Sequence, residues 1–398
     1  MTSEAITAWL KPLRSVLDPA SGIDWRRLEA LNVALDAALT AYPVGARLSA
    51  GAERSRRLRV IRRELAQHGH FGTTGDAALQ VLAQFVCGYR DIDLRDATGL
   101  GHGELIARHG SPQAQQRWIP RLQDGELAGI AITESHGGSC PAATRTRALP
   151  ASNGTWLVSG RKTWISRLTE AAVFVVFFRD PTGQLAAAAI DASHPALHRQ
   201  PIPPTGLAGW TWGILDLDAV PVHSEHVLHG DGMALLRRHF ANYRPLMAAT
   251  ALGGAAAVFD TVTGTLTARH SVGDVSRLRD SALVTIGRTH AQLVTALLGA
   301  VVACHLADTG HEQAESCSAA MKAHGIDTAN HATAELALLL GAVGFRADSQ
   351  IAKIRRDLNG LLYADGIHDS LYRTAGKHHT APARAPVPVH RQPAPLTA

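Results

Sequence analysis

The sequence predicts a mainly helical protein with a central β domain, on three observations along its 398 residues. Residues 1–126 place apolar side chains at helical spacing, as at Leu58 and Ile61. Residues 127–231 carry short alternating or apolar runs between turn signals, which is typical of strands. Residues 232–377 return to long runs rich in Ala and Leu. We therefore expect an N-terminal helical domain, a small middle β-barrel and a C-terminal four-helix bundle.

Local signals place helices in the N-terminal domain. Ser111 and Pro112 are a typical helix start, and Asp124-Gly125 is a typical end. A further amphipathic helix is predicted where apolar residues interleave with Arg54, Arg56, Arg57, Arg59, Arg62 and Arg63. Its basic outer face is interpreted as a solvated surface, with docking of an acidic partner as the alternative.

The middle domain shows clear strand and turn signals. Residues 171–178 form an apolar strand, and the turn 180–183 leads into a second strand at 185–190. A hairpin is expected over 156–166, with its turn at Gly160.

Four long helices are predicted in the C-terminal part, at 240–268, 277–306, 313–342 and 349–375. The segment 378–398 contains five of the 19 prolines and is expected to be a mobile, non-helical tail.

Composition excludes several classes of protein. The net charge is +5, but no zinc finger or aromatic RNA-binding motif accompanies it, so no nucleic-acid partner is expected. No apolar run of membrane-spanning length and no secretory signal are recognised, so no membrane association is expected. The four cysteines lack metal-type spacing, so we expect no metal, reduced thiols and a cytoplasmic location.

Residues 129–166 are the most informative part of the chain. One strand ends at Thr133, and another ends at Trp164, Ile165 and Ser166. An indole can cover one face of a flat ring, while hydroxyls and backbone N–H groups bond its polar edge. Such an arrangement fits a flavin. The simpler alternative is an ordinary hairpin with a packed Trp.

The two strand ends resemble a known family. Residues 133–140 read Thr-Glu-Ser-His-Gly-Gly-Ser-Cys, and residues 160–166 read Gly-Arg-Lys-Thr-Trp-Ile-Ser. They are similar in order and spacing to the T-E-x-x-x-G-S-D turn and the G-x-K-x-W-I-T strand of the acyl-CoA dehydrogenase family. The resemblance runs from about residue 60 to about residue 376.

The resemblance implies that FAD is the cofactor. It places Thr133, Trp164, Ile165 and Ser166 against the flavin ring. It also places Ser139 beside the cofactor and near the pantetheine arm of the substrate.

Two further family patterns are altered in this chain. Arg269 opens a stretch that resembles R-x-x-F-G, with Val272 in place of Phe. In the family this Arg reaches the flavin diphosphate of a neighbouring subunit, which implies a homodimer or homotetramer. Gly341 lies in a stretch that resembles Q-x-x-G-G-x-G, with Leu338 and Ala342 replacing Gln and Gly. We therefore expect a lower affinity for FAD than in relatives.

The resemblance also implies a catalytic base. Asp365-Gly366 stands where the family places a catalytic Glu followed by Gly, and the Asp side chain is one methylene shorter. The other family location for a base carries Tyr243, which is no carboxylate. Arg244 and Gly366 are implied substrate contacts. The alternatives are that Asp365 is an ordinary loop residue and that Arg244 is a surface salt-bridge partner.

By resemblance, the expected reaction is α,β-dehydrogenation of an acyl thioester of coenzyme A or acyl carrier protein. Asp365 removes the α proton and a hydride passes to flavin N5. An electron-accepting flavoprotein or oxygen takes the electrons. The altered motifs are associated with a specialised-metabolism enzyme. Two alternatives remain open, namely a flavin monooxygenase of the same fold and a non-catalytic binding relative.

Overall fold

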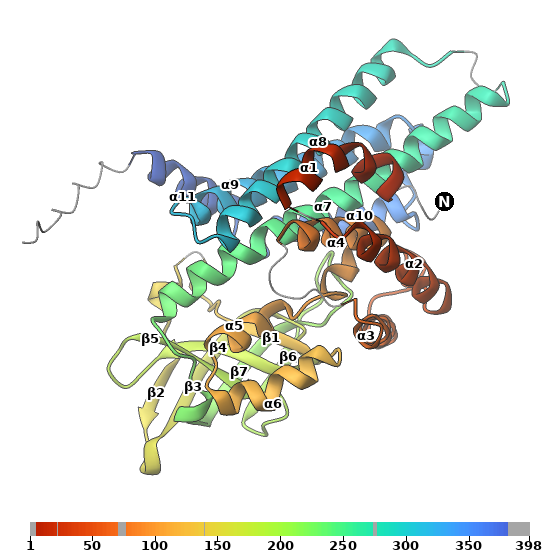
Figure 1. The fold of residues 1–398 in the computed structure, drawn as a ribbon. Coiled ribbons are helices and arrows are strands. Elements are labelled where there is room, and N and C mark those ends of the chain that lie inside the picture. The colour runs from red at the N-terminus through yellow and green to blue at the C-terminus, as the bar shows by residue number, and fades with distance from the viewer. Residues whose placement is uncertain (1–4, 22, 71–76, 139, 274–276, 381–398) are drawn as a thin grey trace, which may run out of the picture.

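The computed structural model describes residues 5–21, 23–70, 77–138, 140–273 and 277–380. A β domain lies beneath a layer of long helices, and the N-terminal helices pack beside both (Figure 1). The prediction of a mainly helical protein with a central β domain is therefore confirmed. Ser139 and residues 381–398 of the predicted tail lie outside the described residues.

The regular elements of the N-terminal part are all helices within its described residues. Asp24 accepts a hydrogen bond from the Arg27 N–H (3.1 Å) and caps α2, while Ser111 Oγ accepts one from the Ala114 N–H (3.1 Å) and caps α6. The elements are a π-helix Ala5–Leu10, α1 Arg14–Ser21, α2 Trp25–Ala41, α3 Ala52–Gln67, α4 Ala77–Arg90, α5 Glu104–His109 and α6 Pro112–Gln123, with 3-10 helices Lys11–Leu13, Ile92–Asp96 and Gly101–Gly103.

The basic face predicted for α3 is only partly solvated. Arg54 and Arg62 are buried, with 4% and 1% of their surface exposed. The Arg62 guanidinium donates to the Gly125 and Gly99 carbonyls (both 3.0 Å). The prediction of a solvated face was wrong for these two residues, because Arg62 donates to backbone carbonyls of distant loops and Arg54 binds Asp93 (3.0 Å) and the Gly45 carbonyl (2.9 Å).

The β domain is one seven-stranded sheet. Its strands pair in the order β1-β4-β2-β3-β7-β6, and β5 pairs with β4. The bounds are β1 Leu127–Ala131, β2 Arg147–Pro150, β3 Thr155–Ser166, β4 Ala171–Arg179, β5 Leu185–Asp191, β6 Leu197–Pro201 and β7 Trp212–His223.

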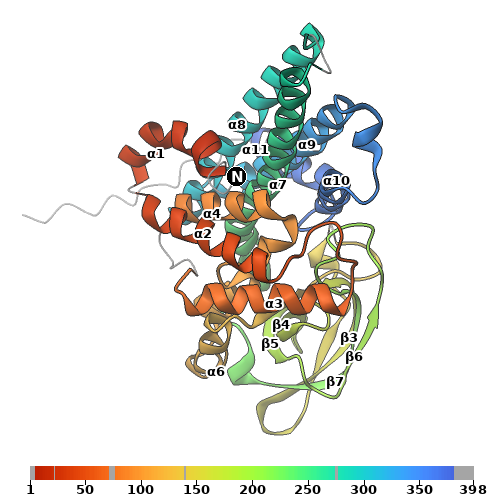
Figure 2. The same cartoon turned by 90° about the vertical axis from the view of Figure 1, so that its right-hand side faces the viewer.

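The hairpin turn expected at Gly160 is absent. β3 continues through Gly160 as a single strand paired antiparallel to β7, and only its register shifts between Val158 and Gly160. Helices α5 and α6 lie against the sheet (Figure 1), and α3 runs along its side (Figure 2).

The C-terminal part differs from the four helices that were predicted. It contains α7 Gly232–Ser271, α8 Asp280–Asp308, α9 Ala314–Leu338, a 3-10 helix Gly341–Phe345, α10 Gln350–Leu361 and α11 His368–Thr380. The single helix expected at 349–375 is broken in two, because Asp365 and Gly366 have positive φ (57° and 113°). Residues 378–380, expected to start a non-helical tail, instead complete α11.

Two helices, α7 and α8, are long and apolar enough to cross a membrane by length and composition alone. The sequence argument that no run reaches this length was therefore wrong. Within the most apolar part of each helix, 67% of α7 and 44% of α8 is buried against the rest of the protein, and core helices of soluble proteins pass the same test.

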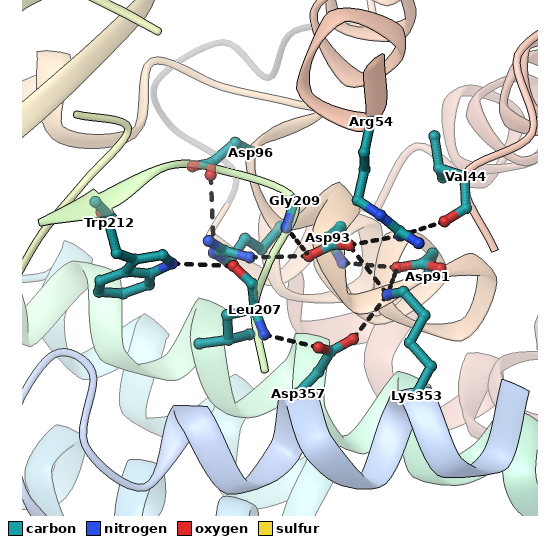
Figure 3. A network of polar contacts seen from close by, with 12 residues as sticks. Val44, Arg54, Asp91, Asp93, Asp96, Leu207, Gly209, Trp212, Lys353 and Asp357 are labelled. Carbon is teal, nitrogen blue, oxygen red and sulfur yellow. Dashed lines mark hydrogen bonds and ion pairs between the residues drawn. The ribbon is translucent and has the colours of Figure 1, made fainter. Parts of the chain in front are cut away.

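A buried charge network joins three separate parts of the chain (Figure 3). Lys353 of α10 contacts three carboxylates, at 2.5 Å from Asp91, 3.0 Å from Asp93 and 2.7 Å from Asp357. Burial alone would lower the pKa of Lys353, but the three carboxylates raise it, so the ammonium stays charged. These carboxylates lie within 4.8 Å of one another, a spacing that suits a metal ion, but here each contacts the Lys353 ammonium.

The same carboxylates reach into the loop before β7. Asp357 accepts a hydrogen bond from the Leu207 N–H (2.7 Å), and Asp93 accepts one from the Gly209 N–H (3.1 Å). Arg54 of α3 also binds Asp93, at 3.0 Å. The network therefore fixes α10 and the β7 loop to the N-terminal helices.

We predict that Lys353→Met destabilises the protein by about 3–5 kcal/mol, because three buried carboxylates lose their cation. The measurement is denaturant unfolding of the wild type and the variant. Arg346→Gln is the control, since it removes an exposed pair with Asp348 and should cost less than about 1 kcal/mol. Equal losses in the two variants would contradict the role given to Lys353.

Candidate functional site

A cavity of 1010 Å³ lies where the sheet meets the C-terminal helices. Its walls come from the ends of β1 and β3, the loop before β7, α7 and the α10–α11 turn. It brings together seven of the residues predicted from the sequence, which are Thr133, Trp164, Ile165, Ser166, Arg244, Asp365 and Gly366. Segments more than 230 residues apart, from Thr133 to Gly366, thus meet at one place.

Trp164 presents its indole to this cavity. The register of β3 shifts between Lys162 and Ile165, and Trp164 has φ of 57°. A bulky residue with positive φ is strained, and such strain is concentrated at functional sites. The side chain is 56% exposed, although it lies on a cavity wall. The indole is therefore available to cover a flat ligand.

The neighbouring wall leaves room for a ligand at the Thr133 hydroxyl. A Cβ added at Gly138 would lie 2.9 Å from Thr133 Oγ1, so only glycine leaves this hydroxyl open. An open hydroxyl beside an exposed indole fits the ring of a flavin, and the cavity volume suits such a ligand. The residues present therefore fit FAD.

A buried ion pair holds these two strand ends together. Lys162 Nζ donates to Glu134 Oε1 (2.9 Å) and to the Ile132 carbonyl (3.1 Å). Glu134 also accepts from the Thr146 N–H (2.9 Å) and hydroxyl (2.6 Å). Burial alone would raise the pKa of Glu134, but bonds from Lys162 and Thr146 lower it to about 2. Both residues lie within the two sequence motifs, but the sequence alone did not predict that they bind each other.

Asp365 lies in the turn between α10 and α11, and two cations hold that turn, the buried Lys322 and the partly buried Arg244. Lys322 of α9 donates to the carbonyls of Leu361 (2.9 Å) and Gly366 (2.8 Å). Arg244 of α7 donates from Nε to the Asp365 carbonyl (3.0 Å). The role of Lys322 was not predicted from the sequence. The one sequence feature that could have indicated it is a single Lys within a stretch of small residues.

Burial raises the pKa of the Asp365 carboxyl above its ordinary value, and the charges of Lys322, Arg167, Arg95 and Arg244 oppose the shift. A carboxylate with a raised pKa is a stronger base than an exposed one. This is the property that proton abstraction next to a carbonyl requires.

Tyr243 stands at the other location considered for a base. Its hydroxyl accepts a hydrogen bond from Arg167 (3.3 Å), and Arg167 also pairs with Asp96. Burial raises the pKa of the Tyr243 phenol, so it stays neutral. Tyr243 therefore contributes a polar wall and leaves Asp365 as the better candidate base.

Two predicted residues lie outside this cavity. Arg269 is in the last turn of α7, and Gly341 opens the 3-10 helix Gly341–Phe345. The α7–α8 end projects beyond the other helices (Figure 1). Large apolar side chains near both positions are exposed, namely Val272 (72%), Leu338 (79%), Val343 (51%) and Phe345 (91%).

Comparison with known families identifies the chain. Residues 129–220 match the middle domain of acyl-CoA dehydrogenase, and residues 230–378 match its C-terminal domain. Together the matches cover more than half of the chain, which belongs to the acyl-CoA dehydrogenase family. Enzymes of this family are flavin oxidoreductases that use FAD.

Curated relatives and solved structures agree with this family. The chain is 26% identical over 281 residues to the very long-chain specific acyl-CoA dehydrogenase of Rattus norvegicus. The aligned region covers 67% of this chain but only 43% of that relative. The chain therefore spans less than half of this relative's length.

Among solved structures, butyryl-CoA dehydrogenase from Megasphaera elsdenii has a TM-score of 0.75 at 18% identity, covering 89% of this chain and 98% of that one. A glutaryl-CoA dehydrogenase from Mycobacterium smegmatis in complex with FADH2 has a TM-score of 0.71 at 20% identity, covering 82% and 86%. At these identities the likeness shows the shared fold.

We predict that Lys162→Met weakens FAD binding at least about 10-fold, because Glu134 loses its cation and the end of β3 that carries Trp164 is released. The measurement is titration of FAD into cofactor-free protein, followed by flavin fluorescence. Arg161→Gln is the matched control, since Arg161 is the preceding residue and pairs with Asp216 on the exposed face. An unchanged dissociation constant in Lys162→Met would show that the pair does not organise the cofactor wall.

Proposed function

We propose that this protein catalyses FAD-dependent α,β-dehydrogenation of an acyl-pantetheine thioester, carried by coenzyme A or by an acyl carrier protein. One observation carries the proposal. A partly buried carboxylate, Asp365, lines the same cavity as the exposed indole of Trp164 and the residues Thr133 and Ser166.

In this proposal, Asp365 takes the proton from the carbon next to the thioester carbonyl. Its raised pKa favours proton transfer, and its place in a cavity excludes bulk water from the reacting atoms. When bound, FAD supplies the acceptor for the hydride that leaves the β carbon. Trp164, Thr133 and Ser166 orient the cofactor ring against the substrate.

Asp365 is shorter than the family Glu, and we propose that the turn makes up the missing length. The positive φ at Asp365 directs the turn toward the cavity, and Lys322 and Arg244 bind its backbone carbonyls. Backbone placement would then set the reach of the carboxylate. Misplacement of the carboxylate by an ångström would lower the rate about 10²-fold. Holding the turn in one position therefore protects the rate of proton transfer.

A monooxygenase of this fold, the alternative considered from the sequence, would need no carboxylate base. The Asp365 carboxylate on the cavity wall, with its raised pKa, therefore favours dehydrogenation. We further propose that the electrons pass to an electron-accepting flavoprotein or to oxygen. The altered motifs fit a role in specialised metabolism, and the four free cysteines fit the reducing cytoplasm.

We also propose that the protein works as a homodimer or homotetramer. The exposed apolar residues Val272, Leu338 and Phe345 would be covered in such an assembly. Arg269 and Gly341, which lie outside the cavity of their own subunit, could then bind the cofactor of a neighbouring copy.

We predict that anaerobic mixing of the FAD-loaded protein with acyl-CoA thioesters bleaches the visible flavin band. The rate should fall as the pH is lowered through the pKa of Asp365, since only the ionised carboxylate accepts a proton. That pKa should lie above about 3.9, the ordinary value for aspartate, because burial raises it.

Asp365→Asn should abolish the bleaching while FAD remains bound. Glu315→Gln is the control, because Glu315 also lines the cavity but pairs with Arg237 (3.8 Å) at a more exposed position. Bleaching by Asp365→Asn at the rate of the wild type would remove Asp365 from the mechanism.

A further inference from the structure

One buried arginine at the cavity, Arg95, has carboxylates near it but no hydrogen bond from its terminal nitrogens to any described residue. The side chain of Arg95 is only 4% exposed. It lines the main cavity and also a second, smaller cavity of 100 Å³, with Tyr243 as a further residue common to both. Arg95 therefore lies in the wall between the two spaces.

Within the described residues, neither terminal nitrogen of Arg95 has a hydrogen-bond partner. The nearest carboxylates are Asp93, at 3.6 Å from Nη1, and Asp96, at 3.8 Å from Nε. Both distances exceed those of a hydrogen bond. A guanidinium carries five N–H donors, and leaving them unmet in a buried place is costly.

Asp93 is already bound by Arg54 and Lys353 (Figure 3), and Asp96 is bound through one of its two oxygens. Asp93 binds Lys353 (3.0 Å) and Arg54 (3.0 Å). Asp96 pairs with Arg167 through Oδ1, whereas its Oδ2, the oxygen nearest Arg95, makes no hydrogen bond within the described residues. Arg95 therefore has two carboxylates within 4 Å but no hydrogen bond to either of them. A ligand anion could supply the bonds that the protein does not.

The charge of the cavity wall points the same way. Arginines outnumber carboxylates among its lining residues, which include Arg95, Arg167, Arg237, Arg244 and Arg373 against Glu315 and Asp365. Arg167 and Arg237 are paired with Asp96 and Glu315. The excess positive charge would attract an anionic ligand.

We propose that Arg95 is the recognition residue for a carboxylate at the far end of the acyl group, so that the substrate is the monothioester of a dicarboxylic acid. This inference rests on the proposed function, because it takes the acyl group to occupy the cavity that Asp365 faces. A planar carboxylate accepts two parallel bonds from a guanidinium fork. A methyl-ended chain would leave the same donors buried and unmet.

The test compares matched ligands on the FAD-loaded protein. Succinyl-, glutaryl- and adipoyl-CoA are titrated by calorimetry beside butyryl-, pentanoyl- and hexanoyl-CoA. At least one dicarboxylic thioester should bind about 10-fold or more tightly than its neutral partner of equal length. Equal or weaker binding of every dicarboxylic thioester would overturn the proposal. In that case, water or another group would satisfy the Arg95 donors.

Variants assign the preference to its residue. Arg95→Gln should lose the preference for the carboxylate while binding of hexanoyl-CoA changes little, and Arg95→Lys should keep part of it. Arg117→Gln is the control, since it removes one exposed arginine of α6 and should keep the full preference. A preference that survives Arg95→Gln, or an equal loss for neutral and anionic thioesters, would contradict the assignment.

The wild-type comparison remains decisive if Arg95→Gln does not fold. Flavin bleaching in the same samples separates this proposal from the proposed function. Bleaching by neutral thioesters without any preference would sink only the role of Arg95. Preferential binding without bleaching would sink the dehydrogenation and leave the anion site standing.

Discussion

The ammonium of Lys353, held among three buried carboxylates, is the interaction on which the arrangement of the site depends. It joins α10 to the 3-10 helix Ile92–Asp96 and its N-cap Asp91, and through Asp93 and Asp357 to the loop before β7. That loop forms part of the cavity wall, and α10 leads directly into the turn of Asp365. A charge this deeply buried is tolerable only because its partners surround it.

Buried lysines also hold the backbone in place at the cavity itself. Lys162 pins the ends of β1 and β3 through Glu134, and Lys322 holds the Asp365 turn through two backbone carbonyls. Each lysine is almost fully buried, and each binds groups from segments distant in sequence. Burying an ammonium is costly, so these contacts fix the backbone at a few defined points. The side chains that face the cavity are thereby held in place by residues that do not line it.

Part of the cavity wall could be predicted from the sequence because its residues lie in short motifs. Trp164, Thr133 and Asp365 were placed together by resemblance, and the structure brings them to one cavity. The helix break at Asp365 was missed, since apolar spacing continues on both sides of an Asp-Gly pair that favours a turn. The burial of Arg62 was missed as well, because its partners are backbone carbonyls far along the chain.

We propose that the Asp365 carboxylate removes the α proton of a bound acyl thioester. The most direct measurement is incorporation of deuterium from D2O at the α carbon, with the flavin reduced beforehand so that dehydrogenation cannot proceed. The wild-type protein should incorporate deuterium, and Asp365→Asn should not. Equal incorporation by both proteins, or none by the wild type, would contradict this account.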